Sequence, residues 1–400
     1  MRASSLAARF PKLDFDAYHR RELPPRLADG RGRRAARDLG ARAPLAFELP
    51  DGRAYQYVPC GDEMAVAPGS DGAEVVVGLD DDAFTAFVHE LHTGAGLFYG
   101  GRLAFRRGGY PALERWEPAL RALWSDRAIF DRGALDLRGR DGGPLDPRRS
   151  FDLAASDDDL RAFLHAAGYL VVRRVFHPDE LARLSDAADR LLAAAQPGDR
   201  RSWWARTRTD DAVCCRVTYA NLQDRRIAAL SGDVRLHRLA ALGAPGLRPG
   251  PDRCDGHSLV VKHGGVTEGL ADLPWHRDCG LGGHPVMCPN LQLGIQLDAA
   301  TPASGRLHVL AGSWRTSCHR SELERPDGLP IVAVDTEPGD VTVHFGDVLH
   351  AAPPPAAPGR GRRALYVSFF SPATFELIPP GHGYNDVLLG RDDGLVVAGP

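Results

Sequence analysis

The sequence predicts an α+β protein with two domains, of which the C-terminal one is a double-sheet β-barrel or jelly roll with flanking helices. Two observations support this prediction. From about residue 258 onward, short apolar segments alternate with turns rich in Gly, Pro and Asp. Residues 126–155 are rich in Gly, Pro, Asp and Arg without a period of 2 or 3.6, which indicates a linker. A smaller α+β domain is therefore expected at 10–125.

The N-terminal domain is predicted to begin with an arginine-rich helical segment at 14–40. Short alternating segments then predict four strands, at 45–49, 53–58, 63–68 and 73–79. Asp80 or Asp81 is expected to cap the next helix. The apolar residues of that helix follow at helical spacing and are Phe84, Phe87, Val88 and Leu91. A final helix carries Leu113, Trp116, Leu120 and Leu123.

The C-terminal domain is predicted at 156–380, with a tail at 381–400. Ser156 and Asp159 form a capping-box pattern for a helix that Gly168 ends. Apolar segments bounded by turn residues predict the strands of this domain, at 169–176, 258–262, 290–297, 305–310, 331–335, 340–345 and 364–370.

The composition excludes several classes of function. The 49 basic and 52 acidic residues give a formal net charge of -3, which disfavours a protein that binds nucleic acid or an anionic membrane by charge. No segment approaches the about 18 apolar residues of a membrane-spanning helix, and the N-terminus lacks the pattern of a signal peptide. The seven cysteines are an odd number without CxxC spacing. They are expected to be reduced thiols in a cytoplasmic protein.

The pattern His-x-Asp, which is typical of metal sites, occurs twice. His177 and Asp179 flank a proline where a strand gives way to a long amphipathic helix, so we interpret this copy as a helix start. His276 and Asp278 lie at the entry to the β-rich half. Since residues i and i+2 of a strand face the same side, they can present a nitrogen and an oxygen ligand to one ion.

A third ligand is needed for an open metal site, and His350 supplies one. It follows a predicted strand and lies 72 residues after Asp278. Two histidines and one carboxylate on one face leave three positions open on an octahedral ferrous ion. Taken alone, the three residues fit equally well as hydrogen-bonded polar groups of a barrel.

Basic residues near this group are candidates for binding an anionic cosubstrate. Arg362 lies twelve positions after His350 and opens a strand, with Arg363 beside it. A guanidinium there can form a bidentate pair with a carboxylate. Lysine occurs only at Lys12 and Lys262, so 47 of the 49 basic residues are arginine and the type of residue at 362 carries little information. Lys262 is a further candidate for cosubstrate contact, or a solvated lysine at a strand end.

Several motifs in this order resemble the phytanoyl-CoA dioxygenase family of iron(II)- and 2-oxoglutarate-dependent oxygenases. The resemblance covers residues 156–372. The motifs are DDLRAFLHAAGYLVVRRVFHPDEL, WHRD, NLQLGIQLDAATPASGRLHVLAGSWRTS, GDVTVHFGDVLHAA and RRAL. Two features depart from the family pattern: Trp314 replaces a usual histidine, and the loop after His350 is rich in proline.

The resemblance implies a double-stranded β-helix of the cupin type, with His276, Asp278 and His350 as iron ligands. It implies that Arg362 binds 2-oxoglutarate. Arg363 is the second choice, since alternation along the strand would turn it to the other face. The implied reaction consumes O2 and 2-oxoglutarate, releases succinate and CO2 and hydroxylates a small molecule. Related halogenases carry a small residue in place of the carboxylate, so Asp278 argues against halogenation. Epoxidation, desaturation and ring formation stay open.

The N-terminal domain resembles, more loosely, sterol-carrier-protein-2-like domains. The similarity lies in the short strands followed by the segment 80–108 and a helix-rich end. It implies an apolar cavity and a lipidic, acyl or polycyclic substrate, as in natural-product biosynthesis. The alternative is that the apolar residues of this segment make an ordinary core; they are Phe84, Phe87, Leu97, Phe98 and Phe105. Trp203 and Trp204 are candidates for lining the substrate entrance or for ordinary packing.

Two other functions are compatible with the sequence. One is a lipid or acyl carrier whose oxygenase barrel is catalytically inactive. The other is a cupin-like enzyme that uses a different divalent metal without 2-oxoglutarate. The sequence indicates neither the substrate nor the oligomeric state.

Overall fold

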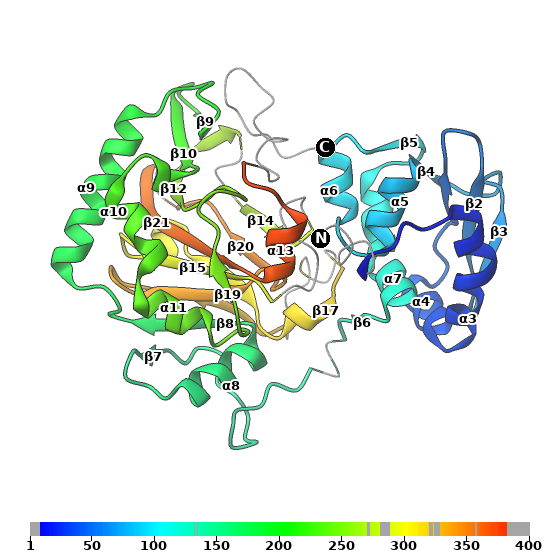
Figure 1. Ribbon diagram of the computed structural model, residues 1–400, viewed down its shortest axis with the longest axis horizontal. Helices are drawn as coiled ribbons and strands as arrows, with labels where there is room; N and C mark the ends of the chain where they lie inside the picture. The colour runs from blue at the N-terminus through cyan, green and yellow to red at the C-terminus, as the bar shows by residue number, and fades with distance from the viewer. Residues whose placement is uncertain are drawn as a thin grey trace.

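The structure is a computed structural model that describes residues 9–381, apart from 132, 134, 270–272, 281–288, 320–322, 324–328 and 357. In Figure 1 the N-terminal domain, blue to cyan, lies to the right of the C-terminal domain, green to red. Each part has its own hydrophobic core. The mixed α+β organisation predicted from the sequence is confirmed. Nearly all of the predicted tail at 381–400 lies outside the described residues.

The N-terminal domain is built on a five-stranded sheet of order β3-β2-β1-β4-β5. Its strands are β1 (Leu45–Glu48), β2 (Ala54–Cys60), β3 (Glu63–Pro68), β4 (Val75–Leu79) and β5 (Leu103–Arg107). Its helices are α2 (Phe15–Ala17), the π-helix η1 (Tyr18–Glu22), α3 (Leu23–Ala28), α4 (Arg31–Leu39), α5 (Asp81–Val88), α6 (Gly94–Tyr99) and α7 (Tyr110–Ser125). The first four strands lie where the sequence predicts them, whereas β5 was not predicted.

Aromatic rings fill the space between this sheet and its helices. Phe84 lies 4.9 to 6.2 Å, between ring centroids, from Phe15, Tyr18, Phe47 and Trp124, mostly edge to face. Such contacts add about 0.5–1.5 kcal/mol per pair beyond the burial of apolar area. Phe84, Phe87 and Leu97 are thus core residues. The resemblance to sterol-carrier domains stays a prediction.

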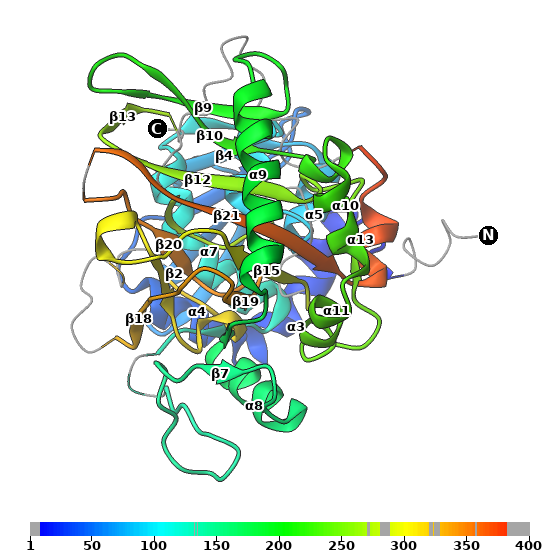
Figure 2. The same ribbon diagram turned by 90° about the vertical axis from the view of Figure 1, so that its left-hand side faces the viewer.

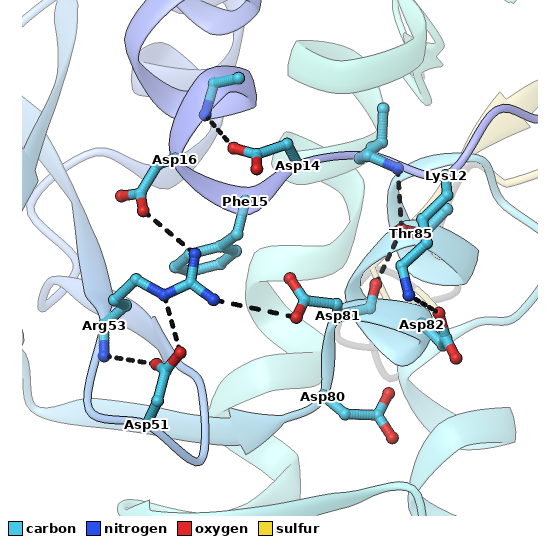
Figure 3. A network of polar contacts seen from close by, with 12 residues as sticks. Lys12, Asp14, Phe15, Asp16, Asp51, Arg53, Asp80, Asp81, Asp82 and Thr85 are labelled. Carbon is cyan, nitrogen blue, oxygen red and sulfur yellow. Dashed lines mark hydrogen bonds and ion pairs between the residues drawn. The ribbon is translucent and has the colours of Figure 1, made fainter.

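A polar network on the surface of the N-terminal domain fastens its first residues to the rest of that domain (Figure 3). The Arg53 guanidinium donates hydrogen bonds to Asp51 and Asp16, and the backbone N–H of Leu13 donates to Thr85. The Asp80 carboxylate accepts a hydrogen bond from the N–H of Ala83 and so caps α5 as predicted. Because most of these charges are exposed, the network orients the chain more than it stabilises it.

The C-terminal domain contains two sheets. The larger, ten-stranded sheet has the order β13-β9-β10-β12-β21-β15-β19-β8-β7, with β11 (Arg248–Pro249) paired to β21. Its other strands are β7 (Phe151–Asp152), β8 (Tyr169–Arg173), β9 (Ser202–Thr207), β10 (Ala212–Val217), β12 (Ser258–Gly264), β13 (Val266–Glu268), β15 (Leu291–Gln296), β19 (Val341–Phe345) and β21 (Gly359–Phe370). The smaller sheet has the order β14-β20-β16-β18. Its strands are β14 (Leu273–His276), β16 (Leu307–Leu310), β18 (Ile331–Val334) and β20 (His350–Ala352).

Helices flank the larger sheet. The α-helices are α8 (Asp157–Ala167), α9 (Pro178–Ala194), α10 (Arg225–Ala229), α11 (Val234–Ala240) and α13 (Pro372–Leu377). Short 3-10 turns are η3 (Ala220–Leu222), η4 (Leu230–Gly232), η5 (Pro302–Ser304) and η6 (Ser313–Arg315). Figure 2 shows α9 running across the outer face of the larger sheet. Ser156 caps α8, and Gly168 ends it in the left-handed conformation, as the sequence predicts.

Side chains alternate along the strands of the larger sheet, so that one face packs against helices and the other, inner face borders a cavity. Leu293 of β15 lies opposite Val343 of β19 and Val367 of β21, and all three belong to the core that also contains Leu181, Leu184 and Leu191 of α9. The neighbouring residue Gln292 lies opposite His344 and Ser368 and faces a cavity. Since side chains alternate along a strand, a buried apolar outer face leaves the inner face available for polar groups.

The predicted linker at 126–155 contains two short strands that pair with strands of the C-terminal domain. Its short strand β6 (Ala128–Ile129) pairs in parallel with β17 (Thr316–Ser317), and β7 joins the larger sheet beside β8. A two-residue strand is too short for a sequence period, so these pairings were not predictable. None of the described helices has both the length and the apolar composition that crossing a bilayer requires.

Gly339→Ala is expected to destabilise the C-terminal domain. Gly339 has φ +92°, and an added Cβ would lie 2.5 Å from the carbonyl oxygen of Phe176. Strain and overlap together are expected to lower the free energy of unfolding by about 3 kcal/mol. Gly52→Ala is the matched control, because Gly52 has φ +87° and nothing within 4 Å of the added Cβ. It should lose only about 1 kcal/mol. Equal losses in urea denaturation would contradict the role of the close contact.

Candidate active site

Two antiparallel strands of the smaller sheet bring His276 and His350 together. His276 ends β14, His350 begins β20, and the two residues are direct partners in the register. Directly opposed residues on one face have neighbouring side chains. The ring centroids of the two imidazoles accordingly lie 4.2 Å apart. Strand pairing thus joins residues that are 74 positions apart in the sequence.

Asp278 completes the group. Its backbone N–H donates to the carbonyl oxygen of Gly346, which holds the residue beside the strand ends. The carboxylate Oδ1 lies 3.5 Å from Nε2 of His276 and 3.8 Å from Nε2 of His350. One ligand atom from each of the three residues lies within 4.8 Å of the others. The structure therefore brings together the three residues that the sequence predicts as metal ligands.

Backbone carbonyl groups orient both imidazoles. Nδ1 of His276 lies 2.7 Å from the carbonyl oxygen of Pro274, and Nδ1 of His350 lies 3.0 Å from that of Val348. A proton on each Nδ1 leaves the Nε2 lone pair directed at the group, as in metal sites whose ligands are held by outer hydrogen bonds. Burial lowers the pKa of His350 to about 3, which keeps its ring neutral. Burial opposes ionisation of Asp278, but the rings of His350, His276 and His344 lower its pKa well below the usual range.

The sequence analysis missed His344, which lies beside the group. His344 is buried in β19, and its Nε2 lies 3.5 Å from Oδ2 of Asp278. Its ring centroid is 4.7 Å from that of His350. The sequence does indicate which way His344 points, because alternation along β19 puts it on the face opposite to that of Val343 and Phe345. Only the fold shows that this face borders the group.

The three residues line a cavity of about 350 Å3 between the two sheets and the N-terminal domain. Apolar side chains make much of the wall, and they include Leu273, Trp275, Leu307, Leu323, Leu349 and Phe370. Trp203 also lines the cavity, whereas Trp204 packs against the hydrophobic core. The sequence left both tryptophans open between the substrate entrance and ordinary packing; Trp203 lines this cavity, and Trp204 packs.

Arg362 of β21 lines the same cavity and is 3% exposed. Its Nε donates to the carbonyl oxygen of Gly305 at 3.0 Å, and Nη1 lies 3.4 Å from Oε1 of Gln296. No carboxylate in the part of the chain that the structure describes forms an ion pair with this guanidinium. A buried charge without a counter-ion is unfavourable, so the position favours an anionic ligand.

Lys262 lies beside Arg362, because the two residues are register partners on β12 and β21. The lysine is 1% exposed, lines the cavity and donates from Nζ to the carbonyl oxygen of Ala352 at 2.6 Å. The interpretation of Lys262 as a solvated strand-end lysine is therefore wrong. Its burial follows from the position of β12 in the middle of the larger sheet.

Arg363 faces away from the cavity. Its guanidinium forms ion pairs with Asp298 at 2.9 Å and with Asp189 of α9 at 2.8 Å. Alternation along β21 turns Arg363 to the outer face of the sheet, under the helix, while Arg362 points inward. Arg363 is therefore removed from the candidates for cosubstrate binding.

The other His-x-Asp copy lies at a helix start. His177 is the N-cap residue of α9, Pro178 is its first residue, and the N–H of His177 donates to Glu180 at 2.8 Å. At the other copy, His276 and Asp278 lie with His350 beside the cavity, so two imidazole nitrogens and one carboxylate oxygen come together there. This donor set fits iron(II), which binds two histidines and one carboxylate and keeps open positions for other ligands.

The chain is similar to several solved structures. The structure of AviO1 from Streptomyces viridochromogenes Tue57 is 26% identical over 55% of this chain and 96% of AviO1, with a TM-score of 0.45. EctD from S. alaskensis with bound Fe is 24% identical over 62% of this chain and 88% of EctD, with a TM-score of 0.45. The non-heme alpha-ketoglutarate-dependent epimerase SnoN from nogalamycin biosynthesis is 20% identical over 54% of this chain and 80% of SnoN, also with a TM-score of 0.45.

No curated protein matches the chain in sequence. The family assignment comes from the match of the family described as phytanoyl-CoA dioxygenase (PhyH) to residues 164–364, which is half of the chain. The matched range contains His276, Asp278, His350 and Arg362. The chain belongs to the phytanoyl-CoA dioxygenase family of oxygenases, whose cofactors are iron(II) and 2-oxoglutarate.

Proposed function

We propose that this protein is an oxygenase that hydroxylates a small molecule and releases succinate and CO2. One observation carries the proposal: a single cavity holds both the His276–Asp278–His350 group and the buried guanidinium of Arg362, which no described carboxylate neutralises. The first feature fits a metal ion and the second fits an anionic cosubstrate. Together they are the two requirements of a 2-oxoglutarate-dependent reaction.

His276, Asp278 and His350 would hold iron(II) through their Nε2 and carboxylate oxygen atoms. When bound, iron(II) and 2-oxoglutarate supply the oxidising chemistry, in which one O2 and one 2-oxoglutarate give succinate, CO2 and one oxygen atom inserted into a substrate C–H bond. The carbonyl groups of Pro274 and Val348 keep both imidazoles oriented. We further propose that the two sheets around this group form the jelly roll expected from the sequence.

Arg362 would bind the distal carboxylate of 2-oxoglutarate, with Lys262 adding positive charge beside it. Both side chains are held by backbone carbonyl groups, of Gly305 and Ala352 respectively, so they need little reorganisation when the anion binds. A buried guanidinium fork recognises a carboxylate through two parallel hydrogen bonds. The site is therefore preorganised for a carboxylate such as the distal one of 2-oxoglutarate.

Hydroxylation is favoured over halogenation because Asp278 supplies a carboxylate where related halogenases carry a small residue. The substrate is proposed to have an apolar body, since the cavity wall near the metal-binding group is largely aliphatic and aromatic, with Trp275 and Leu349 among its residues. A lipidic, acyl or polycyclic compound has this property.

Adding iron(II) and 2-oxoglutarate to the metal-free protein without oxygen is expected to give a weak visible charge-transfer band. Admitting O2 should then produce succinate, faster in the presence of a substrate, which a panel of lipidic and polycyclic compounds can identify. Binding is measured by absorption and calorimetry and succinate by mass spectrometry. A wild-type protein that binds neither iron nor 2-oxoglutarate would refute the proposal. Co-purified lipid together with no succinate formation would instead support the inactive carrier.

A further inference from the structure

The N-terminal domain forms one wall of the catalytic cavity. Its helices α6 and α7 lie on the side that faces the C-terminal domain (Figure 1). Residues of this region that line the cavity are Thr93, Tyr110, Glu114, Glu117 and Arg121. None of them falls within the range matched by the oxygenase family, which starts at residue 164.

Specific contacts hold this wall in place near the metal-binding group. The N–H and hydroxyl of Thr93 both donate to the carbonyl oxygen of Gly280, at 2.8 and 2.9 Å, two residues after Asp278. His319 Nε2 lies 2.8 Å from a carboxylate oxygen of Asp38. The pairing of β6 with β17 adds a backbone connection. The wall is therefore anchored at several points on both domains.

Two carboxylates of α7 line the cavity, and the charge of Arg121 partly offsets the effect of burial on one of them, Glu117. Glu114 and Glu117 form no ion pair with any residue that the structure describes, and Glu117 Oε2 accepts only a 3.3 Å hydrogen bond from the N–H of Gly94. Burial raises the pKa of Glu117. Partly buried carboxylates that line a cavity favour hydrogen-bond donors there, and a ligand in the cavity can supply them.

Two further polar atoms, one on α7 and one on the adjoining strand β17, are buried and lack hydrogen-bond partners. Arg121 is 6% exposed and donates from Nε to Glu90 at 3.1 Å, but its Nη2 makes no hydrogen bond. Ser317 of β17 is 1% exposed, and its Oγ makes none either. Both residues line the cavity, and α7 packs on β17. Buried polar atoms without partners are rare, which indicates that a ligand satisfies them.

The hydrogen-bond donors and acceptors among these four residues restrict which functional groups a ligand can carry. Ionised carboxylates only accept hydrogen bonds, a guanidinium only donates them, and a serine hydroxyl does both. An ammonium group would satisfy Glu114 and Glu117 but would leave Nη2 of Arg121 without an acceptor. A carboxylate would satisfy Arg121 but would be repelled by the two glutamates. Hydroxyl groups both donate and accept, so adjacent hydroxyl groups satisfy the whole set.

We propose that the N-terminal domain forms the substrate-recognition side of the cavity. Glu114, Glu117 and Arg121 of α7, together with Ser317 of the adjoining strand β17, bind a hydroxyl-bearing end of the substrate. The apolar remainder of the substrate then lies along Trp275 and Leu349, toward the metal-binding group. That this substrate is oxidised rests on the proposed function, whereas recognition of the hydroxyl groups does not.

Three probes of similar size test the inference on the full-length protein, with and without iron(II) and 2-oxoglutarate: 1-phenyl-1,2-ethanediol, 2-phenylethylamine and phenylacetate. The diol is expected to bind most tightly. Glu117→Ala should weaken diol binding about tenfold, because a hydrogen bond to a charged group is lost. Glu117→Gln should weaken it less than about threefold, since the amide oxygen still accepts. Glu63→Gln on exposed β3 is the control and should change nothing.

The outcomes separate the alternatives. Tightest binding of the amine, with Glu117→Gln as damaging as Glu117→Ala, would overturn the proposal in favour of a cationic substrate. Equal diol affinity in all variants, or no diol binding by the wild type, would also overturn it. Ser317→Ala, a small change, provides a second test if Glu117→Ala does not fold, and it should weaken diol binding too. Diol binding that depends on Glu117 in a protein without iron or 2-oxoglutarate binding would refute the proposed oxygenase activity alone.

Discussion

Asp278→Ala is expected to remove iron binding and, with it, succinate formation. Asp278 supplies the one carboxylate of the group, and its Oδ1 lies within 3.8 Å of Nε2 of both His276 and His350. Without it, two imidazoles remain, which bind iron(II) weakly. Mutation of a residue that only hydrogen-bonds to a metal ligand typically lowers metal affinity by about 10–100-fold. Loss of a ligand itself is therefore expected to lower it by more than about 100-fold. Metal content, the visible band with 2-oxoglutarate and the rate of succinate formation measure it.

The His-x-Asp copy at the start of α9 offers a matched control for this experiment. Asp179 occupies the same place in the pattern but lies exposed in the first turn of α9. Asp179→Ala should therefore bind iron as the wild type does. His276→Ala should behave like Asp278→Ala. If Asp278→Ala retains stoichiometric iron and the band, the metal site lies elsewhere and the assignment of the three ligands is wrong.

Arg362→Ala is expected to raise the Kd for 2-oxoglutarate about 100-fold, because it removes a buried, charge-assisted bidentate contact. Iron binding should persist, since Arg362 does not contact the metal-binding group. Arg362→Lys should recover part of the affinity, because it restores the charge but not the planar fork. Calorimetric titration of 2-oxoglutarate into the iron-loaded protein measures all three effects.

Arg363→Ala is the neighbouring control. Arg363 pairs with Asp298 and Asp189 outside the cavity, so its loss should lower the free energy of unfolding without changing the Kd for 2-oxoglutarate. An equal loss of 2-oxoglutarate affinity in both variants would contradict the assignment of Arg362. Activity that survives Arg362→Ala with unchanged dependence on 2-oxoglutarate would favour the cupin-like enzyme that uses another cosubstrate.

Local patterns predicted most of the strands and helix ends. Every predicted strand of the C-terminal domain forms, because each has an apolar run long enough to show alternation and is bounded by turn residues. The hairpin of β9 and β10 was not predicted, although both strands carry buried apolar residues, such as Trp203 and Val217. β5 was missed because two of its five residues are arginine.

The candidate site was predictable to the extent that its residues lie in recognisable order along the chain. His276 and Asp278 are two positions apart, and His350 and Arg362 follow within a family-like spacing. His344 and the wall formed by Glu114, Glu117 and Arg121 were not predictable. Their place at the cavity depends on the packing of α7 against β17 and of β19 beside β15, which no local spacing records.

The sequence by itself determined the types of group available for chemistry and the face of the strand that each occupies, because side-chain direction follows from a period of two residues. Alternation alone separates Arg362 from Arg363 in this way. Only the tertiary structure decided that Lys262 is buried beside Arg362, that His344 adjoins Asp278 and that the N-terminal domain closes the cavity. Those relations depend on contacts between residues far apart in the chain, which are set by the summed packing of two cores rather than by any local period.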